Sequence, residues 1–353
     1  MAESKRDGCN RCDKLRNISQ QKVKSATSIL LRIDMNHFDR LRELHHWLST
    51  RIIGQETLLE RLLIALLADG HLLVEGAPGL AKTKAIKTLA EGIDADFHRV
   101  QFTPDLLPGD ITGTDIYRPE SGTFSFQPGP IFHNLVLADE INRAPAKVQS
   151  ALLEAMAERQ ISAGRHTYPL PQLFLVMATQ NPIEQEGTYP LPEAQLDRFL
   201  MHVRVAYPEV DAERKILQLA RAEAQQVAQP LTEKISQQTI FEARAATLKL
   251  HMAPAVEEYI VQLVMATRQP KNYDAQLGGW IEFGASPRAT IALDRCARAR
   301  AFLANRDYVS PDDVQDVCAD VFRHRLILSF DAEASGIDVD AVIARILELV
   351  PVA

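Results

Sequence analysis

Between residues 51 and 205, short continuous apolar runs alternate with stretches whose apolar residues recur at helical spacing. The continuous runs predict strands at 71–75, 97–102, 135–138, 172–179 and 200–205. The helical spacing predicts helices at 56–68, 82–91 and 145–158. Strands that alternate with helices are typical of a parallel sheet with helices on both faces. We therefore expect an α/β domain built on a five-stranded parallel sheet.

The pattern changes after Pro208, where only helical spacing is found. It predicts helices at 211–227, 256–267, 287–305, 311–328 and 339–349. We expect an α/β domain at 35–206, followed by an all-helical domain at 207–353.

The N-terminal residues 1–34 have no clear periodicity and contain eight basic against four acidic residues. They predict a mobile basic tail. A helix is predicted at 36–49, directly after Met35. We expect that translation starts at Met35, which the intact mass of the native protein would test.

Two interruptions of the α/β region predict β-hairpins. Residues 103–130 contain five prolines and four glycines, and the runs 116–118 and 123–126 flank a turn in this stretch. A second hairpin is predicted at 160–170, with its turn at 163–165. Long insertions in a compact domain are either functional or plain surface loops, and the sequence leaves both open.

Composition narrows the class of protein. The 353 residues are 46% hydrophobic, which is enough for a sizeable core, and no apolar run approaches the length of a membrane span. No signal peptide is evident, so we expect a cytoplasmic protein without membrane insertion. The net charge is −7, and the acidic body argues against general duplex-DNA binding. Four cysteines are too few for a disulfide scaffold, and Cys9 and Cys12 lack a second pair for a zinc site.

The main chemical motif follows the predicted strand 71–75. A loop that ends in Lys-Thr and opens a helix is typical of a nucleoside-triphosphate cradle. Its residues are Gly76, Ala77, Pro78, Gly79, Leu80, Ala81, Lys82 and Thr83. Lys82 would reach the terminal phosphates, and the Thr83 hydroxyl would bind Mg²⁺. The usual pattern has glycine at the place of Ala81, so the motif alone leaves open a plain strand-to-helix turn.

Polar residues also end two later strands. Asp139 and Glu140 follow the strand 135–138, where Asp139 could position Mg²⁺ and Glu140 could polarise the attacking water. Asn181 follows the strand 172–179, within reach of the γ-phosphate or the water. Because parallel strands end at one edge of a sheet, we expect these side chains near the cradle.

Six short motifs in consistent order resemble the AAA+ ATPases and, within them, the MoxR family. They are Ile53-Gly54-Gln55-Glu56, GAPGLAKT at 76–83, LADEINRAP at 137–145, ATQNP at 178–182, LPEAQLDRF at 191–199 and GASPRA at 284–289. The resemblance extends from about Met35 to the C-terminus. In this family the loop commonly reads Leu-Ala-Lys-Thr, which accounts for Ala81.

The resemblance implies roles for further residues. Asn181 resembles the sensor-1 residue, Arg198 the arginine finger that reaches a neighbouring subunit, and Arg288 the sensor-2 arginine. Ile53 and Gly54 would line the adenine pocket.

The resemblance also implies an architecture. The two hairpins correspond to the helix-2 insert and the pre-sensor-1 hairpin, and the helical domain corresponds to a lid. Tyr117, Phe124 and Phe126 would either grip a polypeptide or pack the insert's own small core. Both readings stay open.

The implied function is ATP hydrolysis with Mg²⁺ in a homo-oligomeric ring, expected to be a hexamer. Glu140 would act in its own subunit and Arg198 in the next. Members of the family usually work with a partner that holds a von Willebrand factor A domain and remodel, mature or assemble protein clients. A nucleic-acid motor and a nucleotide-gated scaffold with little hydrolysis are the alternatives.

Overall fold

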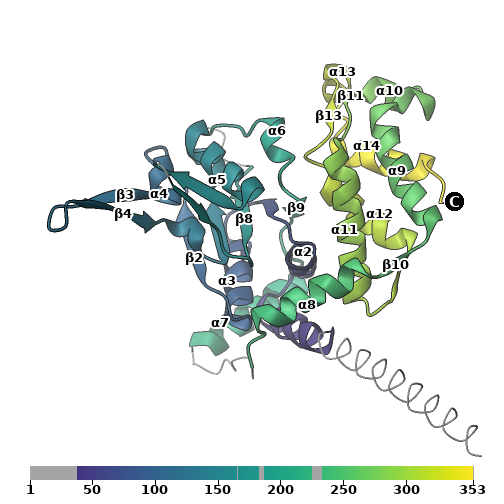
Figure 1. Ribbon diagram of the computed structural model, residues 1–353. Coiled ribbons are helices and arrows are strands. Elements are labelled where there is room, and N and C mark those ends of the chain that lie inside the picture. The colour runs from purple at the N-terminus through teal and green to yellow at the C-terminus, as the bar shows by residue number, and fades with distance from the viewer. Residues whose placement is uncertain (1–37, 165, 183–186, 225–232, 353) are drawn as a thin grey trace, which may run out of the picture.

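The computed structural model describes residues 38–164, 166–182, 187–224 and 233–352. The predicted tail 1–34, Met35, Cys9 and Cys12, the turn residue 165 and the predicted helix end at 225–227 lie outside the described residues. Figure 1 shows an α/β body in the middle, a long hairpin on one side and a helical region on the other.

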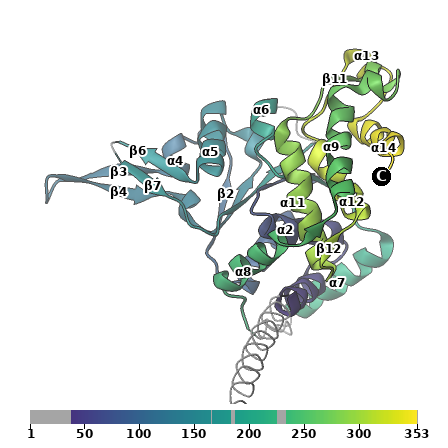
Figure 2. The ribbon, with the colours of Figure 1, turned by 45° about the vertical axis from the view of Figure 1, so that its right-hand side comes forward.

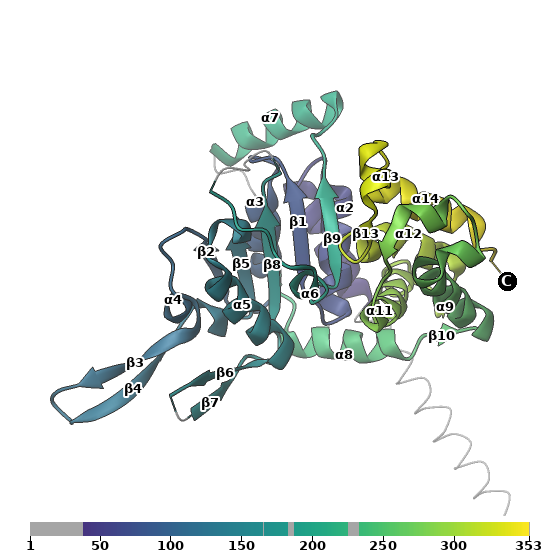
Figure 3. The same ribbon diagram turned by 90° about the horizontal axis from the view of Figure 1, so that it is seen from above.

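The α/β body contains the five-stranded parallel sheet that the sequence predicts. Its spatial order is β2-β5-β8-β1-β9, and every neighbouring pair is parallel. The strands are β1 Leu72–Gly76, β2 Phe97–Gln101, β5 Leu135–Asp139, β8 Leu175–Gln180 and β9 Met201–Val205. Four strands follow the predicted ranges closely, whereas β8 begins three residues later than predicted. Strand β1 lies between the central strand β8 and the edge strand β9, so the loop after β1 opens beside the end of β8 (Figure 3).

Both faces of the sheet are buried in separate apolar cores. Leu72 and Val74 of β1 point into one core, which also contains the helices α2 Glu56–Leu67 and α3 Lys82–Gly92. Leu73, between them, points into the other core, which contains α5 Ala146–Glu158. This two-residue alternation explains why the strands are apolar throughout, since each face packs against helices.

Three further helical segments pack against the body, and the third of them comes from the C-terminal region. Residues 38–51 are helical, as predicted for 36–49. The helices α4 Pro108–Thr112 and α8 Gln237–Leu248 were not predicted. Helix α8 lies against α2 and buries only a few side chains, such as Ile240 and Ala243, so its sequence lacks a clear apolar stripe.

Both predicted hairpins are present. The strands β3 Gly113–Arg118 and β4 Thr123–Pro128 pair antiparallel and extend away from the body, while β6 Gln160–Ala163 and β7 His166–Pro169 lie beside their base (Figure 2). The Phe126 ring stacks on Tyr168 at a centroid distance of 4.0 Å, which joins the two hairpins.

The C-terminal region is helical, with two pairs of very short strands that were not predicted. Its helices are α7 Val210–Ala224, α8, α9 Pro254–Arg268, α10 Leu277–Trp280, α11 Pro287–Leu303, α12 Pro311–Phe322, α13 Phe330–Ala334 and α14 Val339–Leu349. The strand pairs are β10 His251–Met252 with β12 Tyr308–Val309, and β11 Ile281–Phe283 with β13 Ile327–Leu328. The prediction of one helix over 311–328 was wrong, because α12 ends at Phe322 and the chain then turns to pair β13 with β11.

The helical region is joined to the body by charged contacts as well as by its core. The Arg61 guanidinium of α2 is nearly buried, and its Nε lies 2.7 Å from Asp320 Oδ2 and its Nη1 2.9 Å from Asp316 Oδ2 of α12. Breaking a buried pair of this kind is costly, so it fixes how α12 sits on the body.

Helix α7 differs from the other long helices of the described chain because none of its residues is buried. The Lys84 ammonium of α3 lies 2.8 Å from Glu223 Oε1 and holds one end of the helix. In the described part of the chain, no helix is both long and apolar enough to span a membrane.

Candidate active site

The loop between β1 and α3 has the backbone conformation of an anion cradle. Gly79 and Ala81 both have positive φ, at 85° and 56°, and Ala81 is the residue directly before α3. The left-handed conformation is costly for alanine, by about 1–2 kcal/mol, so the fold keeps a strained residue at the place where the common motif has glycine. The N–H groups at the start of α3 are left without helical partners and can bind phosphate.

This loop lines a pocket of about 380 Å³, which we call the P-loop pocket. Its lining consists of Pro78, Gly79, Leu80, Ala81, Lys82, Thr83, Lys84, Arg99, Asp139, Glu140, Thr179 and Asn181. The structure therefore brings together five residues that the sequence predicts for one site, because their strands end at the same edge of the sheet. They are Lys82, Thr83, Asp139, Glu140 and Asn181.

Lys82 is held inside the pocket. Its Nζ donates to the carbonyl oxygens of Gly76 at 2.6 Å and Gln180 at 3.5 Å. Burial lowers the pKa of the Lys82 ammonium from its usual range, and the carboxylates of Asp139 and Glu140 oppose this effect. The ammonium is thus pre-positioned between β1 and β8, at the carboxyl end of both strands.

Asp139 is part of a hydrogen-bonded network. Its Oδ1 accepts from Thr179 Oγ1 at 2.6 Å, and its Oδ2 lies 2.6 Å from Arg99 Nη2. The same Thr179 hydroxyl accepts from the Glu140 N–H at 2.9 Å. Neither Arg99 nor Thr179 was singled out from the sequence, since each becomes visible only when β2 and β8 pair with β5.

The Glu140 side chain also lines the P-loop pocket and is partly exposed. Its Oε2 accepts from Gln101 Nε2 at 2.7 Å and lies 3.2 Å from Arg143 Nε. The residue has a positive φ of 57°, which turns it away from the strand direction of β5. Asn181, at the end of β8, is buried in the same pocket.

The residues of this pocket fit a Mg²⁺ ion. Thr83 and Asp139 supply hydroxyl and carboxylate oxygens, the hard donors that Mg²⁺ prefers beside substrate phosphates. The Arg99 guanidinium against Asp139 indicates that positive charge is stabilised here. Among the described residues, no group of three or more His, Cys, Asp or Glu side chains is arranged to hold a metal by itself.

The predicted adenine-contacting residues lie outside this lining. Neither Ile53 nor Gly54 is among the described residues of the P-loop pocket. Gly54 has a φ of 75°, and a Cβ there would come within 2.9 Å of the Ala212 Cβ and 3.1 Å of the Pro208 Cβ. The glycine is required by its close approach to the beginning of α7.

Arg198 and Arg288 lie at the opposite end of the sheet. Arg198 precedes β9, where the Leu200 N–H bonds to the carbonyl of His71, directly before β1. Its Nη1 donates to the Leu153 carbonyl at 2.6 Å. Arg198 thus lies near the amino end of β1, whereas Lys82 follows its carboxyl end. The five-residue strand separates the two residues, and it is about 13 Å long between its end residues.

Both arginines line a second cavity of about 340 Å³, which we call the arginine pocket. Five arginines line it, against the two carboxylates of Asp69 and Asp197. These arginines are Arg159, Arg198, Arg288, Arg295 and Arg325. The arginine pocket shares no lining residue with the P-loop pocket. The sequence predicts that Arg288 faces phosphates, and in the structure Arg288 lines the same pocket as Arg198. As predicted, Ser286 caps the helix that contains Arg288.

Comparison with known proteins agrees with this geometry. Residues 71–201 match the model of the ATPase family associated with various cellular activities (AAA), and residues 280–346 match the AAA lid domain. Chaperone MoxR1 of Mycobacterium tuberculosis is 49% identical over 300 residues, covering 85% of this chain and 78% of that protein. The chain belongs to the MoxR family of AAA+ ATPases.

Other relatives support the family and its fold. Protein MoxR of Methylorubrum extorquens is 33% identical, covering 80% of this chain and 85% of that protein. The crystal structure of a protein described as an ATPase, from Cytophaga hutchinsonii, is 45% identical with a TM-score of 0.86. The match covers 94% of this chain and 99% of that chain. The MoxR-type fold, with its helical lid, thus extends over nearly the whole chain.

Proposed function

We propose that this MoxR-family chain hydrolyses ATP in the P-loop pocket and that arginines of a second copy complete each pocket. The separation of Lys82 from Arg198 and Arg288 along β1 is the observation that carries the proposal. Arginines at that distance cannot reach phosphates in their own P-loop pocket. They can do so across an interface, which makes an assembly a requirement for turnover.

Within one copy, the P-loop pocket supplies binding and the base. The N–H groups before α3 and the Lys82 ammonium hold the phosphates of ATP, and Asn181 orients the water. Glu140 accepts a proton from that water as its oxygen bonds to the γ-phosphorus and the bond to ADP breaks, which yields ADP and phosphate. Mg²⁺, when bound by Thr83 and Asp139, would neutralise charge on the terminal phosphates.

The second copy supplies positive charge. Arg198 and Arg288 lie together on one surface, so both would face the same terminal phosphate in the neighbouring copy. An arginine given by a neighbour is worth about 10³–10⁵ in rate. Repetition of this head-to-tail contact closes a ring if the rotation allows it, and a hexamer is the expected number.

The hairpins support work on a protein client. Tyr117 and Phe124 form a cross-strand aromatic pair near the tip of β3–β4, and both are more than half exposed. Phe126 instead packs on Tyr168 and Phe132. The interpretation as packing of the insert's own core therefore suits Phe126, and the interpretation as a contact to a polypeptide suits Tyr117 and Phe124. We propose that the tip pair contacts the client. A von Willebrand factor A domain protein is the proposed partner, and the cytoplasm the proposed location.

A mixing experiment tests the shared site. Lys82→Ala removes the phosphate contact, and Arg198→Ala removes the contribution to the neighbour, so each variant alone should lose turnover. Mixed in equal amounts, they form some interfaces with an intact Lys82 and an intact Arg198, and ATPase activity should return in part. The exposed Arg42→Ala serves as the control and should keep full activity.

Glu140→Gln tests the assignment of the base. The variant should bind ATP normally, hydrolyse it about 10²–10⁴-fold more slowly and accumulate as an ATP-bound assembly. Normal turnover of this variant would refute the role of Glu140. A mixture of Lys82→Ala and Arg198→Ala that stays inactive would refute the shared site. Turnover near zero in assembled wild-type protein would favour the scaffold alternative.

A further inference from the structure

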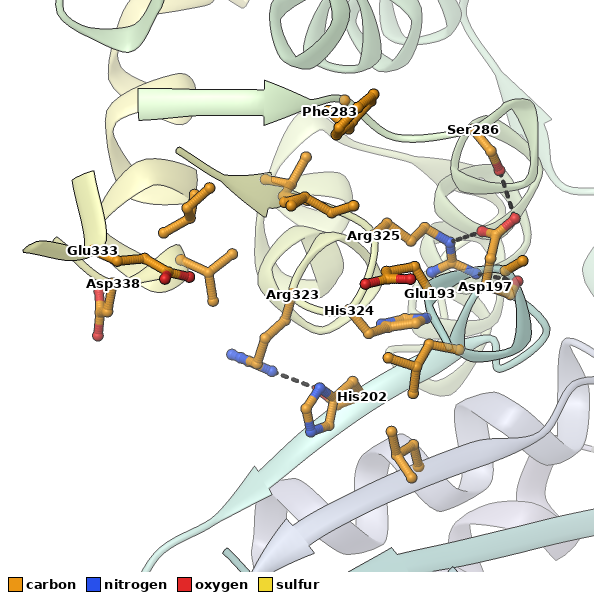
Figure 4. Close-up of a pocket in the computed structure, with 18 of the residues that line it drawn as sticks. Glu193, Asp197, His202, Phe283, Ser286, Arg323, His324, Arg325, Glu333 and Asp338 are labelled. Atoms are coloured by element: carbon orange, nitrogen blue, oxygen red, sulfur yellow. Dashed lines mark hydrogen bonds and ion pairs between the residues drawn. The ribbon is translucent and has the colours of Figure 1, made fainter. Parts of the chain in front are cut away.

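Asp197 lies where the α/β body meets the lid. It follows α6 Glu193–Leu196 and directly precedes Arg198. Its carboxylate accepts from the Ser286 hydroxyl at 2.8 Å and from Arg325 Nε at 2.8 Å, as Figure 4 shows. Ser286 caps the N-terminus of α11 and Arg325 follows α12, so one carboxylate joins three segments that are distant in the sequence.

The two arginines of the proposed shared site both adjoin this carboxylate. Arg198 is its neighbour in the chain, and the Nη1 of Arg288 lies 3.7 Å from Asp197 Oδ2. The Ser286 hydroxyl, held by Asp197, also accepts from the Arg288 N–H at 3.2 Å. Asp197 therefore acts on Arg288 through two routes, one at the side chain and one at the backbone.

Arg325 extends the contact to the segment after Arg198. Its Nη2 donates to the Phe199 carbonyl at 2.6 Å and its Nη1 to the Leu200 carbonyl at 3.2 Å. The Arg325 side chain is only 3% exposed. A buried guanidinium needs a compensating charge, and Asp197 provides it.

We propose that Asp197 is a positioning residue that fixes Arg198 and Arg288 relative to each other, toward the terminal phosphate of ATP bound in a second copy. This inference rests on the proposed function, in which both arginines act across the interface. Without the Asp197 carboxylate, Ser286 and Arg325 lose their shared acceptor, and the start of α11 is free to shift relative to Arg198.

Asp197→Asn removes the charge and keeps the size of the side chain. A displacement of about 1 Å in a catalytic group lowers turnover by about 10²-fold, so kcat should fall by this order while KM for ATP stays the same. In the double variant Arg198→Ala Arg288→Ala, adding Asp197→Asn should change kcat by less than about twofold, because the groups that it positions are gone. A loss of equal size in both backgrounds would overturn the proposal.

Mixing distinguishes a role toward the neighbour from general damage. Asp197→Asn subunits keep their own P-loop, so Lys82→Ala subunits, which keep Asp197, should restore their activity in a mixture. A mixture that stays inactive, while Arg198→Ala with Lys82→Ala recovers, would refute the inference and leave the proposed function standing. Failure of both mixtures would refute the two together.

Two further variants separate positioning from stability. Asp274→Asn is the matched control: Asp274 is as exposed as Asp197, at 18%, and Arg345 Nη2 lies 2.8 Å from its Oδ2 within the lid. It should lower the melting temperature without changing kcat. Ser286→Ala leaves the buried Asp197–Arg325 pair intact and should still lower kcat, whereas an unchanged kcat in this variant would contradict the route through Ser286.

Discussion

Acid should weaken this fold through His71, a buried side chain at the amino end of β1. The imidazole is 5% exposed, its Nδ1 accepts from the Val176 N–H at 3.0 Å, and its ring packs edge-on against Phe174. Burial, with a smaller contribution from the Arg159 guanidinium, lowers the pKa of His71 to about 4. In the unfolded chain the same group would titrate near its ordinary value of about 6.5.

The sign follows from which state binds the proton. Between pH 6.5 and 4 the unfolded chain protonates at His71 and the folded chain does not, so the free energy of unfolding falls as the pH falls. The contribution of His71 is complete above pH 6.5. A difference of about 2.5 pKa units corresponds to a full loss of about 3.4 kcal/mol well below pH 4, of which about 3 kcal/mol is lost at pH 4 and about 2 kcal/mol at pH 5.

The assay is urea unfolding of the wild type and of His71→Asn at pH 7, 6, 5 and 4. The asparagine carbonyl can accept from the Val176 N–H, but asparagine lacks the ring that packs on Phe174, so the variant should be less stable than the wild type at pH 7. Because asparagine does not titrate, the free energy of unfolding of the variant should fall less on acidification than that of the wild type. The gap between the two proteins should narrow by about 2 kcal/mol from pH 7 to 5. His251→Asn, at an exposed histidine, should run parallel to the wild type. A gap that stays constant for His71→Asn would refute the argument.

Three further predictions concern the P-loop and the hairpins. Ala81→Gly should leave the stability unchanged or raise it by up to about 1 kcal/mol in urea unfolding, because relief of the left-handed strain offsets the entropy that glycine loses on folding, and ATP affinity should be retained. Phe126→Ala should cost about 1 kcal/mol and expose the hairpins to limited proteolysis, because the stack on Tyr168 is lost. Phe124→Ala, at a residue 71% exposed, should leave stability unchanged and weaken stimulation of the ATPase by a client. A loss of stability in Phe124→Ala, or a loss of client stimulation alone in Phe126→Ala, would contradict the different roles given to these two side chains.

Features encoded locally were predictable from the sequence. The strand before Gly76, the loop and the helix that begins at Lys82 are consecutive, so their pattern specified the cradle without knowledge of the rest of the fold. Asp139 and Asn181 were also predictable, because parallel strands in one sheet end at the same edge. The hairpins followed from turn residues between short apolar runs.

Features set by long-range packing were not predictable. The position of Arg288 beside Arg198 depends on how the lid packs on the body. This packing is determined by contacts such as the one between Arg61 and Asp320, which are more than 250 residues apart in the sequence. The Arg99–Asp139 pair requires β2 to lie next to β5, and periodicity gives no strand order. Helix α8 buries too few apolar side chains to produce a stripe, so tertiary contacts rather than pattern stabilise it.

The lack of buried residues in α7 has a thermodynamic consequence for the whole chain. A 15-residue helix that buries no residue gains little from tertiary packing, so α7 can melt at a free energy far below that of global unfolding. Its ion pair from Lys84 connects that local equilibrium to α3, the helix that begins at the P-loop. Ligand binding at the P-loop and the folding of α7 are then linked equilibria, and each should shift the other by the same free energy.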